Sequence, residues 1–235
     1  MKQAVAVVTG ASSGIGRAIS AMLLEQGYMV YGFGRDFSKE APLGEGFEPV
    51  ILDMTNLGAL TQAMQDILKE HEIAVLVNNA GVGYFGLHEE LNPAKIQEMV
   101  AVNVTAPLVL SQLALRSLKR QQGWLIQIAS VTAEQSNPHG CAYGATKAAM
   151  NSFSQSLFDE ARKYGVKVAS ILPDMTESNF YRNAPFCQGD TEDTYLHPKE
   201  VADTVKWMLA QRDGMVVSKV TLRPQKHRLG KKSKE

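Results

Sequence analysis

A tyrosine and a lysine stand four residues apart in the segment Tyr143-Gly-Ala-Thr-Lys147, which puts both side chains on one face of a helix. A free phenol has a pKa of about 10, so it transfers protons poorly at neutral pH unless a neighbour stabilises the phenolate. The ammonium group of Lys147 is such a neighbour, since a positive charge favours phenolate by about 1.4 kcal/mol per pKa unit. The segment therefore predicts an acid–base pair.

The same spacing occurs again between Tyr195 and Lys199, so the pair alone is weak evidence. Pro198 suits the first turn of a helix, and we expect this second pair to be structural. The first pair differs because Ser130 precedes it, directly after the apolar stretch 125–128. Open α/β sheets bind ligands at the carboxyl ends of their strands, where a serine hydroxyl can hold a carbonyl oxygen.

Three glycines, Gly10, Gly14 and Gly16, lie between the apolar stretch 5–9 and the helical pattern of 15–26. Glycines there let the backbone turn sharply and approach a pyrophosphate, whose charge is favoured by free N–H groups and the helix dipole. The spacing is Gly-x3-Gly-x-Gly, which differs from the common GxGxxG fingerprint. The segment predicts a nucleotide site, and a tight strand–helix connection is the alternative.

The second apolar stretch ends in Gly34, Arg35 and Asp36. A site for NAD needs a carboxylate near the end of this strand to bind the ribose hydroxyls. A guanidinium there pairs instead with a 2′-phosphate, and Gly34 leaves room for it. The sequence therefore favours NADP(H) over NAD(H). The alternatives are a ribose contact from Asp36 or a surface Arg–Asp pair.

The segments around these residues alternate between two patterns. Apolar stretches predict strands at residues 5–9, 29–33, 50–52, 75–77, 125–128, 166–172 and 216–222, and helical periodicity covers 15–26, 57–69, 94–104, 107–119, 145–163 and 198–210. This alternation favours a parallel sheet with helices on both faces. With right-handed crossovers, it predicts a single-domain, doubly wound α/β fold of the Rossmann type.

Two segments lie outside the alternation. Residues 174–197 lack periodicity and are expected to form an irregular substrate lid within a domain that spans residues 1–223. Residues 224–235 are expected to form a flexible, solvated tail, with a binding tail as the alternative. The basic side chains of this tail are Lys226, Arg228, Lys231, Lys232 and Lys234.

The chain of 235 residues is 45% hydrophobic and has 24 basic and 24 acidic side chains. Zero net charge argues against nucleic acid as a main partner, and no apolar run approaches the ~18 residues of a membrane span.

The cysteines, Cys141 and Cys187, fit a reducing cytosol, and Cys141 is assigned to packing. No cluster has metal-ligand spacing. We expect a cytoplasmic protein, with His139 in a solvated loop or, alternatively, lining the substrate pocket.

Taken together, the motifs resemble the short-chain dehydrogenase/reductase family over about residues 4–220. Residues 9–16 match its TGxxxGxG motif, and residues 78–81 match its NNAG motif. Ser130 precedes Tyr143 by the 13 residues that are usual in the family. Asn103 sits where the family has its catalytic asparagine.

The resemblance implies a catalytic set of Asn103, Ser130, Tyr143 and Lys147. Ser130 would position a substrate carbonyl, and Tyr143 would donate a proton to its oxygen while hydride arrives from a nicotinamide. Lys147 would lower the pKa of Tyr143 and bind the nicotinamide ribose. Asn103 would hold a water molecule that completes a proton relay.

The resemblance also implies a set of cofactor contacts along the chain. Asp53 would contact the adenine, and the backbone of residues 79–81 would line the adenosine. The whole set is Gly10, Ser12, Ser13, Gly14, Ile15, Gly16, Arg35, Asp53, Met54, Asn79, Ala80, Gly81, Tyr143, Lys147, Pro173, Thr176 and Ser178.

The chain departs from the family pattern in two places. Asp174 follows Pro173 where a glycine is usual, and by count Ser178, with Thr176 as a close substitute, replaces a threonine that contacts the nicotinamide amide. Residues 221–224 stand where many members have a glycine-rich end that contributes to a tetramer. A homodimer or homotetramer is the expectation from the resemblance.

We therefore expect NADPH-dependent reduction of a carbonyl group in a small or mid-sized substrate. One alternative is reduction of 3-oxoacyl groups on acyl carrier protein. Residues 174–193 argue against it, because they carry five carboxylates and one arginine, which would repel an acidic carrier. The other alternative is an NADP(H)-binding regulator without activity, although such proteins typically lose a catalytic residue.

Overall fold

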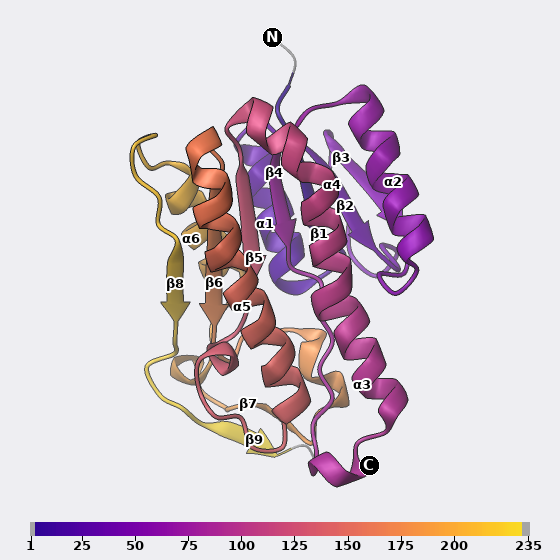
Figure 1. Ribbon diagram of the computed structural model, residues 1–235. Coiled ribbons are helices and arrows are strands. Elements are labelled where there is room, and N and C mark those ends of the chain that lie inside the picture. The colour runs from indigo at the N-terminus through magenta and orange to yellow at the C-terminus, as the bar shows by residue number, and fades with distance from the viewer. Residues whose placement is uncertain (1–2, 232–235) are drawn as a thin grey trace.

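Seven parallel strands form the central sheet of the computed structural model, which describes residues 3–231 (Figure 1). The strands are β1 (Val5–Thr9), β2 (Met29–Gly34), β3 (Phe47–Ile51), β4 (Ile73–Asn78), β5 (Trp124–Ile128), β6 (Lys167–Pro173) and β8 (Lys219–Leu222). Their order is β3-β2-β1-β4-β5-β6-β8, so the winding reverses between β1 and β4. The predicted doubly wound fold is confirmed, and ligands of such sheets bind beside this reversal.

Helices cover both faces of the sheet. On one face lie α1 (Gly14–Glu25) and α6 (Pro198–Leu209), and on the other lie α2 (Leu57–Glu70), α4 (Ala106–Gln121) and α5 (Cys141–Ala161). In Figure 1, α4 and α5 pass in front of the sheet and α1 passes behind it. Alternate residues of β1 face the two helix layers. Val5 and Val7 pack toward α2 and α4, whereas Ala6 and Val8 pack toward α1 and α6. A strand buried on both faces is mainly apolar, as β1 is from Val5 to Val8, before it ends in Thr9.

A π-helical turn, Ala101–Thr105, joins α3 (Pro93–Val100) to α4, so that Pro93–Gln121 is one continuous helix rather than the two that were expected. This helix is long and apolar enough to cross a membrane by length and composition, so the expectation that no stretch approaches a span is wrong. In the fold, Leu110, Ala114 and Leu118 of α4 are fully buried in the core beside the sheet. Packing on the sheet accounts for these apolar residues.

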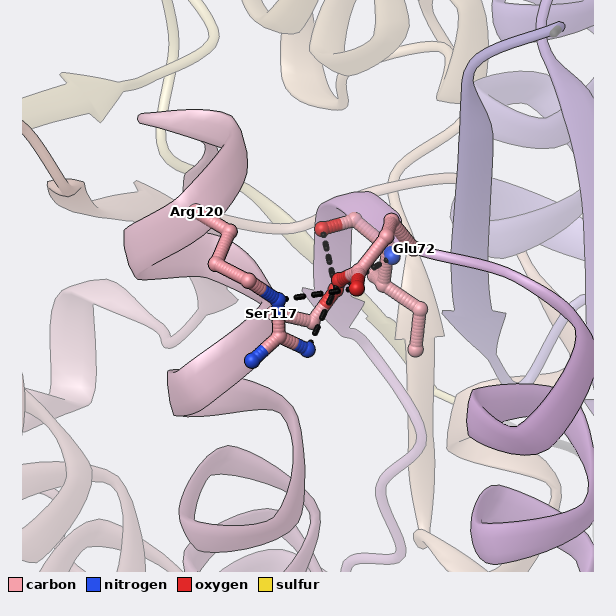
Figure 2. Close-up of polar contacts among 4 residues, drawn as sticks. Glu72, Ser117 and Arg120 are labelled. Atoms are coloured by element: carbon pink, nitrogen blue, oxygen red, sulfur yellow. Dashed lines mark hydrogen bonds and ion pairs between the residues drawn. The ribbon is translucent and has the colours of Figure 1, made fainter.

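A polar cluster fastens the end of α4 to the start of β4 (Figure 2). The guanidinium of Arg120 donates to both carboxylate oxygens of Glu72, at 2.8 and 2.9 Å. The Ser117 hydroxyl donates to Glu72 Oε2 at 2.6 Å and accepts from the backbone N–H of Ile73 at 2.6 Å. The arginine holds the pKa of Glu72 below its usual value through this hydrogen bond. The cluster fixes the helix that carries the π-helical turn.

Three boundaries differ from the expectation for local reasons. β3 begins at Phe47 and tolerates Pro49 because it lies at the edge of the sheet. β8 begins only at Lys219. Helix α5 begins at Cys141, four residues earlier than expected, because its first turn faces the site around Tyr143 rather than the core.

The segment 174–197 and the tail, expected to be irregular and flexible, are partly ordered together. The lid segment contains 3-10 turns at Asn179–Asn183 and Glu192–Thr194 and a short strand, β7 (Phe186–Gln188). β7 pairs antiparallel with β9 (Leu229–Lys231) from the tail, beyond the carboxyl ends of β6 and β8 (Figure 1). The tail residues Lys232 and Lys234 lie outside the described residues.

Candidate active site

One cleft follows the carboxyl ends of the strands from the glycine turn to Tyr143. Of the predicted residues it is lined by Gly10, Ser12, Ser13, Gly14, Ile15, Arg35, Asp53, Met54, Asn79, Ala80, Gly81, Ser130, Tyr143, Lys147, Pro173, Thr176 and Ser178. Gly16 and Asn103 are the two predicted residues that do not line it. Both residues are buried and lie behind the residues that line the cleft.

The glycine turn has no room for side chains at Gly10 and Gly16. Gly10 has a φ of +67°, and a β-carbon there would lie 2.8 Å from Asn79 Nδ2. A β-carbon on Gly16 would overlap the carbonyl oxygen of Gly10 and the same Asn79 amide. The Thr9 hydroxyl accepts the backbone N–H groups of Asn79 and Ala80, each at 2.9 Å. These contacts lock the two glycine-containing motifs into one rigid wall.

The first turn of α1 is open to an anion. Its N-cap residue, Ser13, makes no side-chain capping bond, and no acidic residue lies in the first turn. The free N–H groups and the helix dipole together favour a phosphate at this position.

Arg35 and Asp36 differ in what they face at the end of β2. Arg35 lines the cleft, and its charge helps to lower the pKa of Asp53, although hydrogen bonds from Thr55 contribute more. Asp36 is not among the lining residues. Its carboxylate accepts the backbone N–H and hydroxyl of Ser38, at 2.8 and 2.6 Å. Asp36 is therefore used within its own turn.

Tyr143 lies in the first turns of α5 and lines the cleft together with Ser130, which follows β5 and whose hydroxyl accepts from the Thr132 hydroxyl at 3.0 Å. Burial raises the pKa of Tyr143 well above its ordinary value, the charge of Tyr181 raises that pKa further, and the bond from Ser130 lowers it. Lys147 Nζ donates to the carbonyl oxygen of Ile128 at 2.9 Å and lies 5.8 Å from the centroid of the Tyr143 ring. Burial lowers the pKa of Lys147 to about 8. In this arrangement Ser130, rather than the expected Lys147, is the group that favours the phenolate.

Asn103 projects from the π-helical turn, a distortion that is frequent at functional sites. Its Oδ1 accepts the Val82 N–H at 2.8 Å, and its Nδ2 donates to the Val82 carbonyl at 2.9 Å and to Thr146 Oγ1 at 3.0 Å. Thr146 in turn donates to the carbonyl oxygen of Tyr143 at 2.7 Å. Asn103 therefore ties the backbone after the NNAG motif to the helix of Tyr143. Its role in a water relay stays a prediction.

Asp174 replaces the usual glycine without backbone strain, because it is absent from the described non-glycine residues with positive φ. Its carboxylate accepts the Met175 N–H at 2.8 Å. Thr176 donates to the Asp174 carbonyl at 2.9 Å. The β-carbon of Ser178 lies 3.3 Å from the position that a β-carbon on Gly14 would take, so the lid reaches the glycine turn.

The sequence reasoning missed the aromatic residues of the site. Phe85 and Phe180 contact the Tyr143 ring. Tyr181 packs against both of these rings, and Phe186 packs against those of Phe85 and Tyr181. The four form an aromatic cluster with ring contacts of 5.1–6.5 Å between centroids. Three of these rings come from the lid and Phe85 comes from the loop after β4. The three aromatic residues within a polar segment were the only available signal in the lid sequence.

The remaining candidates have simpler environments. Lys199 pairs with Asp203 at 2.7 Å and Tyr195 contacts the ring of His197, which confirms that the second Tyr–Lys pair is structural. His139 is exposed and does not line the cleft, as a loop residue should be. Cys141 is also exposed at the start of α5, so its assignment to packing is wrong. Among residues 3–231, no group of three or more His, Cys, Asp or Glu side chains could hold a metal ion.

Comparisons with known proteins agree over nearly the whole chain. The family model described as short chain dehydrogenase matches residues 4–185. An uncharacterized oxidoreductase of Staphylococcus epidermidis is 32% identical over 230 residues, covering 95% of this chain and 98% of that protein. A second uncharacterized oxidoreductase, from Staphylococcus saprophyticus, is 32% identical over 237 residues, with the same coverage of 95% and 98%.

Two solved structures are similar in fold and contain a dinucleotide. An alcohol dehydrogenase from Thermococcus sibiricus, complexed with 5-hydroxy-NADP, has a TM-score of 0.87 and 26% identity, covering 97% of this chain and 99% of that one. A metagenomic short-chain oxidoreductase in complex with NADP has a TM-score of 0.81 and 31% identity, covering 94% and 97%.

Proposed function

Because the chain belongs to the short-chain dehydrogenase/reductase family, and is thus an NAD(P)-dependent oxidoreductase, we propose that it uses NADPH to reduce the carbonyl group of a small or mid-sized substrate to an alcohol. The observation that carries the proposal is that Ser130, Tyr143 and Lys147 line one end of the cleft that begins at the glycine turn.

The residues of the cleft fit a dinucleotide. A β-carbon would fill the cradle at Gly10, and the first turn of α1 offers uncapped N–H groups to a pyrophosphate. Asp53 and the backbone of residues 79–81 lie where an adenosine would be held, and Lys147 lies at the Tyr143 end. When bound, the nicotinamide of such a cofactor supplies the hydride.

The preference for NADP(H) rests on Arg35. Its guanidinium is at the cleft and is suited to a forked contact with a 2′-phosphate. The competing carboxylate of Asp36 is bonded to Ser38. Both similar structures described above contain an NADP form, which supports the same preference.

The site is arranged for proton donation to an alkoxide. Burial keeps the Tyr143 phenol protonated at neutral pH, and an alkoxide formed from a carbonyl is more basic than a phenolate, so transfer from Tyr143 is downhill. The Ser130 hydroxyl, which lines the cleft together with the phenol, is suited to hold the carbonyl oxygen. The Tyr143 side chain is only 7% exposed, which limits the access of water to this proton transfer.

Reduction of 3-oxoacyl groups on acyl carrier protein is the alternative. The main argument against it, repulsion between the acidic lid and an acidic carrier, is weaker in the structure than in the sequence. Asp190 and Asp193 of the acidic lid pair with Arg228 and Lys226 of the tail, so the lid repels an acidic carrier less than its sequence suggests. Turnover of a carrier-bound substrate but not of free ketones would favour this alternative.

The test is the variant Tyr143→Phe, measured for NADPH consumption with a panel of free ketones and aldehydes. Turnover should fall by about 10²–10⁴-fold, while calorimetric NADPH affinity stays within about twofold. Tyr195→Phe, from the structural Tyr–Lys pair, is the matched control and should retain activity. Full activity in Tyr143→Phe would overturn the proposed mechanism.

A further inference from the structure

Phe180 and Tyr181 of the aromatic cluster line the cleft beside Tyr143. Phe85 packs against both of these rings, and Phe186 packs against that of Tyr181. The Tyr143 ring lies 5.5 Å from that of Phe85 and 5.4 Å from that of Phe180, and the side chain is 7% exposed. Phe186 contacts Phe85 at 5.1 Å and Tyr181 at 5.6 Å, so the lid rings also hold one another. A substrate that approaches Tyr143 along the cleft meets the rings of Phe180 and Tyr181, which line the same cleft.

The backbone below the rings is shaped to let them meet. A β-carbon on Gly83 would lie 2.8 Å from the Phe85 ring and 2.9 Å from the Phe180 ring. The other buried residues of this cluster, Val82 and Met99, are apolar. A group beside this cluster therefore meets aromatic and aliphatic carbon on one side, and Ser130 and Lys147 line the same cleft.

We propose that the substrate is an aryl carbonyl compound, in which the reacting carbonyl is attached to a flat aromatic ring. This inference rests on the proposed carbonyl reduction and adds its substrate class. A flat ring makes offset and edge-to-face contacts with Phe180 and Tyr181, the two rings of the cluster that line the cleft. A puckered aliphatic ring of the same size cannot make these contacts equally well.

The test compares acetophenone with cyclohexyl methyl ketone, which share a carbon skeleton but differ in planarity. With NADPH, kcat/KM should favour acetophenone by about tenfold. Phe180→Leu, which removes a ring that lines the cleft, should reduce this preference to about twofold. Phe158→Leu, which removes a ring packed against the core on α5, is the control and should leave the preference unchanged.

The possible results distinguish a failure of the aryl substrate class from a failure of the proposed carbonyl reduction. Turnover of both ketones with equal kcat/KM would overturn the substrate class while the proposed reduction stands. A protein that binds NADPH but turns over neither these ketones nor any other carbonyl compound would overturn the proposed function itself, and the substrate class with it.

A second, independent observation concerns the tail. Lys226 Nζ lies 2.7 Å from Asp193 Oδ2, and its backbone N–H donates to the Asp193 carbonyl at 2.8 Å. Arg228 lies 3.7 Å from Asp190. Together with the β7–β9 pairing, these contacts join the basic tail to the acidic lid, and we call them the tail clasp.

The tail clasp and the aromatic cluster share strand β7. This strand begins at Phe186, whose ring contacts Phe85. Gly230 faces Cys187 in the β7–β9 pair, and a β-carbon there would lie 2.7 Å from the Gln188 carbonyl oxygen and 2.9 Å from Cys187 Sγ. We infer that the tail clasp is a positioning element, which holds the lid rings over the substrate site.

The test reverses one charge of the tail clasp. Lys226→Glu should raise KM for a carbonyl substrate about fivefold with kcat within twofold, and should speed hydrogen exchange in residues 183–193. Combining it with Asp193→Lys should restore both values. Lys199→Glu, which breaks an equally short surface pair with Asp203, is the matched control.

Gly230→Val provides a second route, because it separates β7 from β9 without changing a charge. It should show the same faster exchange in residues 183–193. Unchanged exchange in both Lys226→Glu and Gly230→Val would overturn the positioning role, whatever the substrate is. Faster exchange with unchanged KM would limit the tail clasp to lid stability and would equally contradict the inference.

Discussion

The Phe180 ring lies 5.4 Å from the Tyr143 ring, and a β-carbon on Gly81 would lie 3.8 Å from the Phe180 ring and 3.6 Å from Lys147 Nζ. One lid side chain therefore packs on Tyr143 and lies beside the glycine that Lys147 also approaches. Burial is the first cause of the altered pKa in each of them. The lid, as well as the sheet edge, sets the acid–base chemistry.

Replacing Phe180 with alanine should lower the pKa of Tyr143 toward its ordinary value, because burial is what raises it. Oxidation of an alcohol requires the phenolate, so its rate rises with pH as Tyr143 loses its proton. In Phe180→Ala this rise should occur at lower pH than in the wild type. The measurement is the pH dependence of kcat/KM for alcohol oxidation.

Ser130→Ala supplies the opposing control for that experiment. The Ser130 hydrogen bond lowers the pKa of Tyr143, so its loss should move the same rise to higher pH. Phe158→Ala, on the core side of α5, should leave the profile in place. Shifts of Phe180→Ala and Ser130→Ala in the same direction would contradict the assigned causes.

Arg35→Ala should weaken NADPH binding by about 10- to 100-fold, since a charge-assisted hydrogen bond contributes about 1.5–3 kcal/mol. NADH lacks the 2′-phosphate, so its affinity should change by less than about twofold. Calorimetric titration of both cofactors measures the two effects. Asp36→Ala is the neighbouring control, and an effect of Asp36→Ala on NADH but not on NADPH would instead assign the ribose contact to Asp36.

Lys147→Met should change how stability depends on pH. Burial lowers the pKa of Lys147 from 10.5 to about 8, so between these values the unfolded chain binds a proton that the folded chain does not. The free energy of unfolding of the wild type should therefore rise relative to the variant, by about 2 kcal/mol from pH 7.5 to 9.5. Urea unfolding at these pH values gives the difference.

A parallel urea series with Lys199→Met, which removes an exposed amine, should show no such rise. A constant difference between wild type and Lys147→Met across this pH range would mean that the Lys147 amine is solvated in the folded protein, and the burial argument for the whole site would then fail.

Those parts of the site that depend on short segments could be predicted from the sequence. The strand 5–9, the turn around Gly10 and the position of Ser130 follow from local periodicity and turn chemistry, and the structure has all three where they were expected. The crossover rules then place them along one sheet edge without knowledge of side-chain contacts.

The lid, the tail and the pKa of Tyr143 could not be predicted in this way. Phe85 meets Phe186, and β7 meets β9, through contacts between segments that are far apart in the chain. Neither segment has a periodic pattern, because each is only three residues of strand in an otherwise irregular stretch. The burial that raises the pKa of Tyr143 arises from this same packing, so spacing to Lys147 alone predicted the wrong direction.

Arg120→Ala should destabilise the fold by about 0.5–1 kcal/mol at neutral pH, since it removes a two-pronged but partly exposed ion pair with Glu72. Arg120 lowers the pKa of Glu72, so this stabilisation is present above the unfolded pKa of about 4.3 and is lost as pH falls through the lower, folded value. The difference in free energy of unfolding between wild type and variant should therefore shrink below about pH 4.

Arg162→Ala is the matched control, because its pair with Asp159 is a single 3.5 Å contact between more exposed side chains. It should cost less than Arg120→Ala at every pH. A double-mutant cycle with Glu72→Gln isolates the Arg120–Glu72 coupling from the bond between Ser117 and Glu72, which remains in Arg120→Ala. A coupling energy that is unchanged at pH 3 would show that the ion pair is not what connects α4 to β4, and would assign that connection to Ser117.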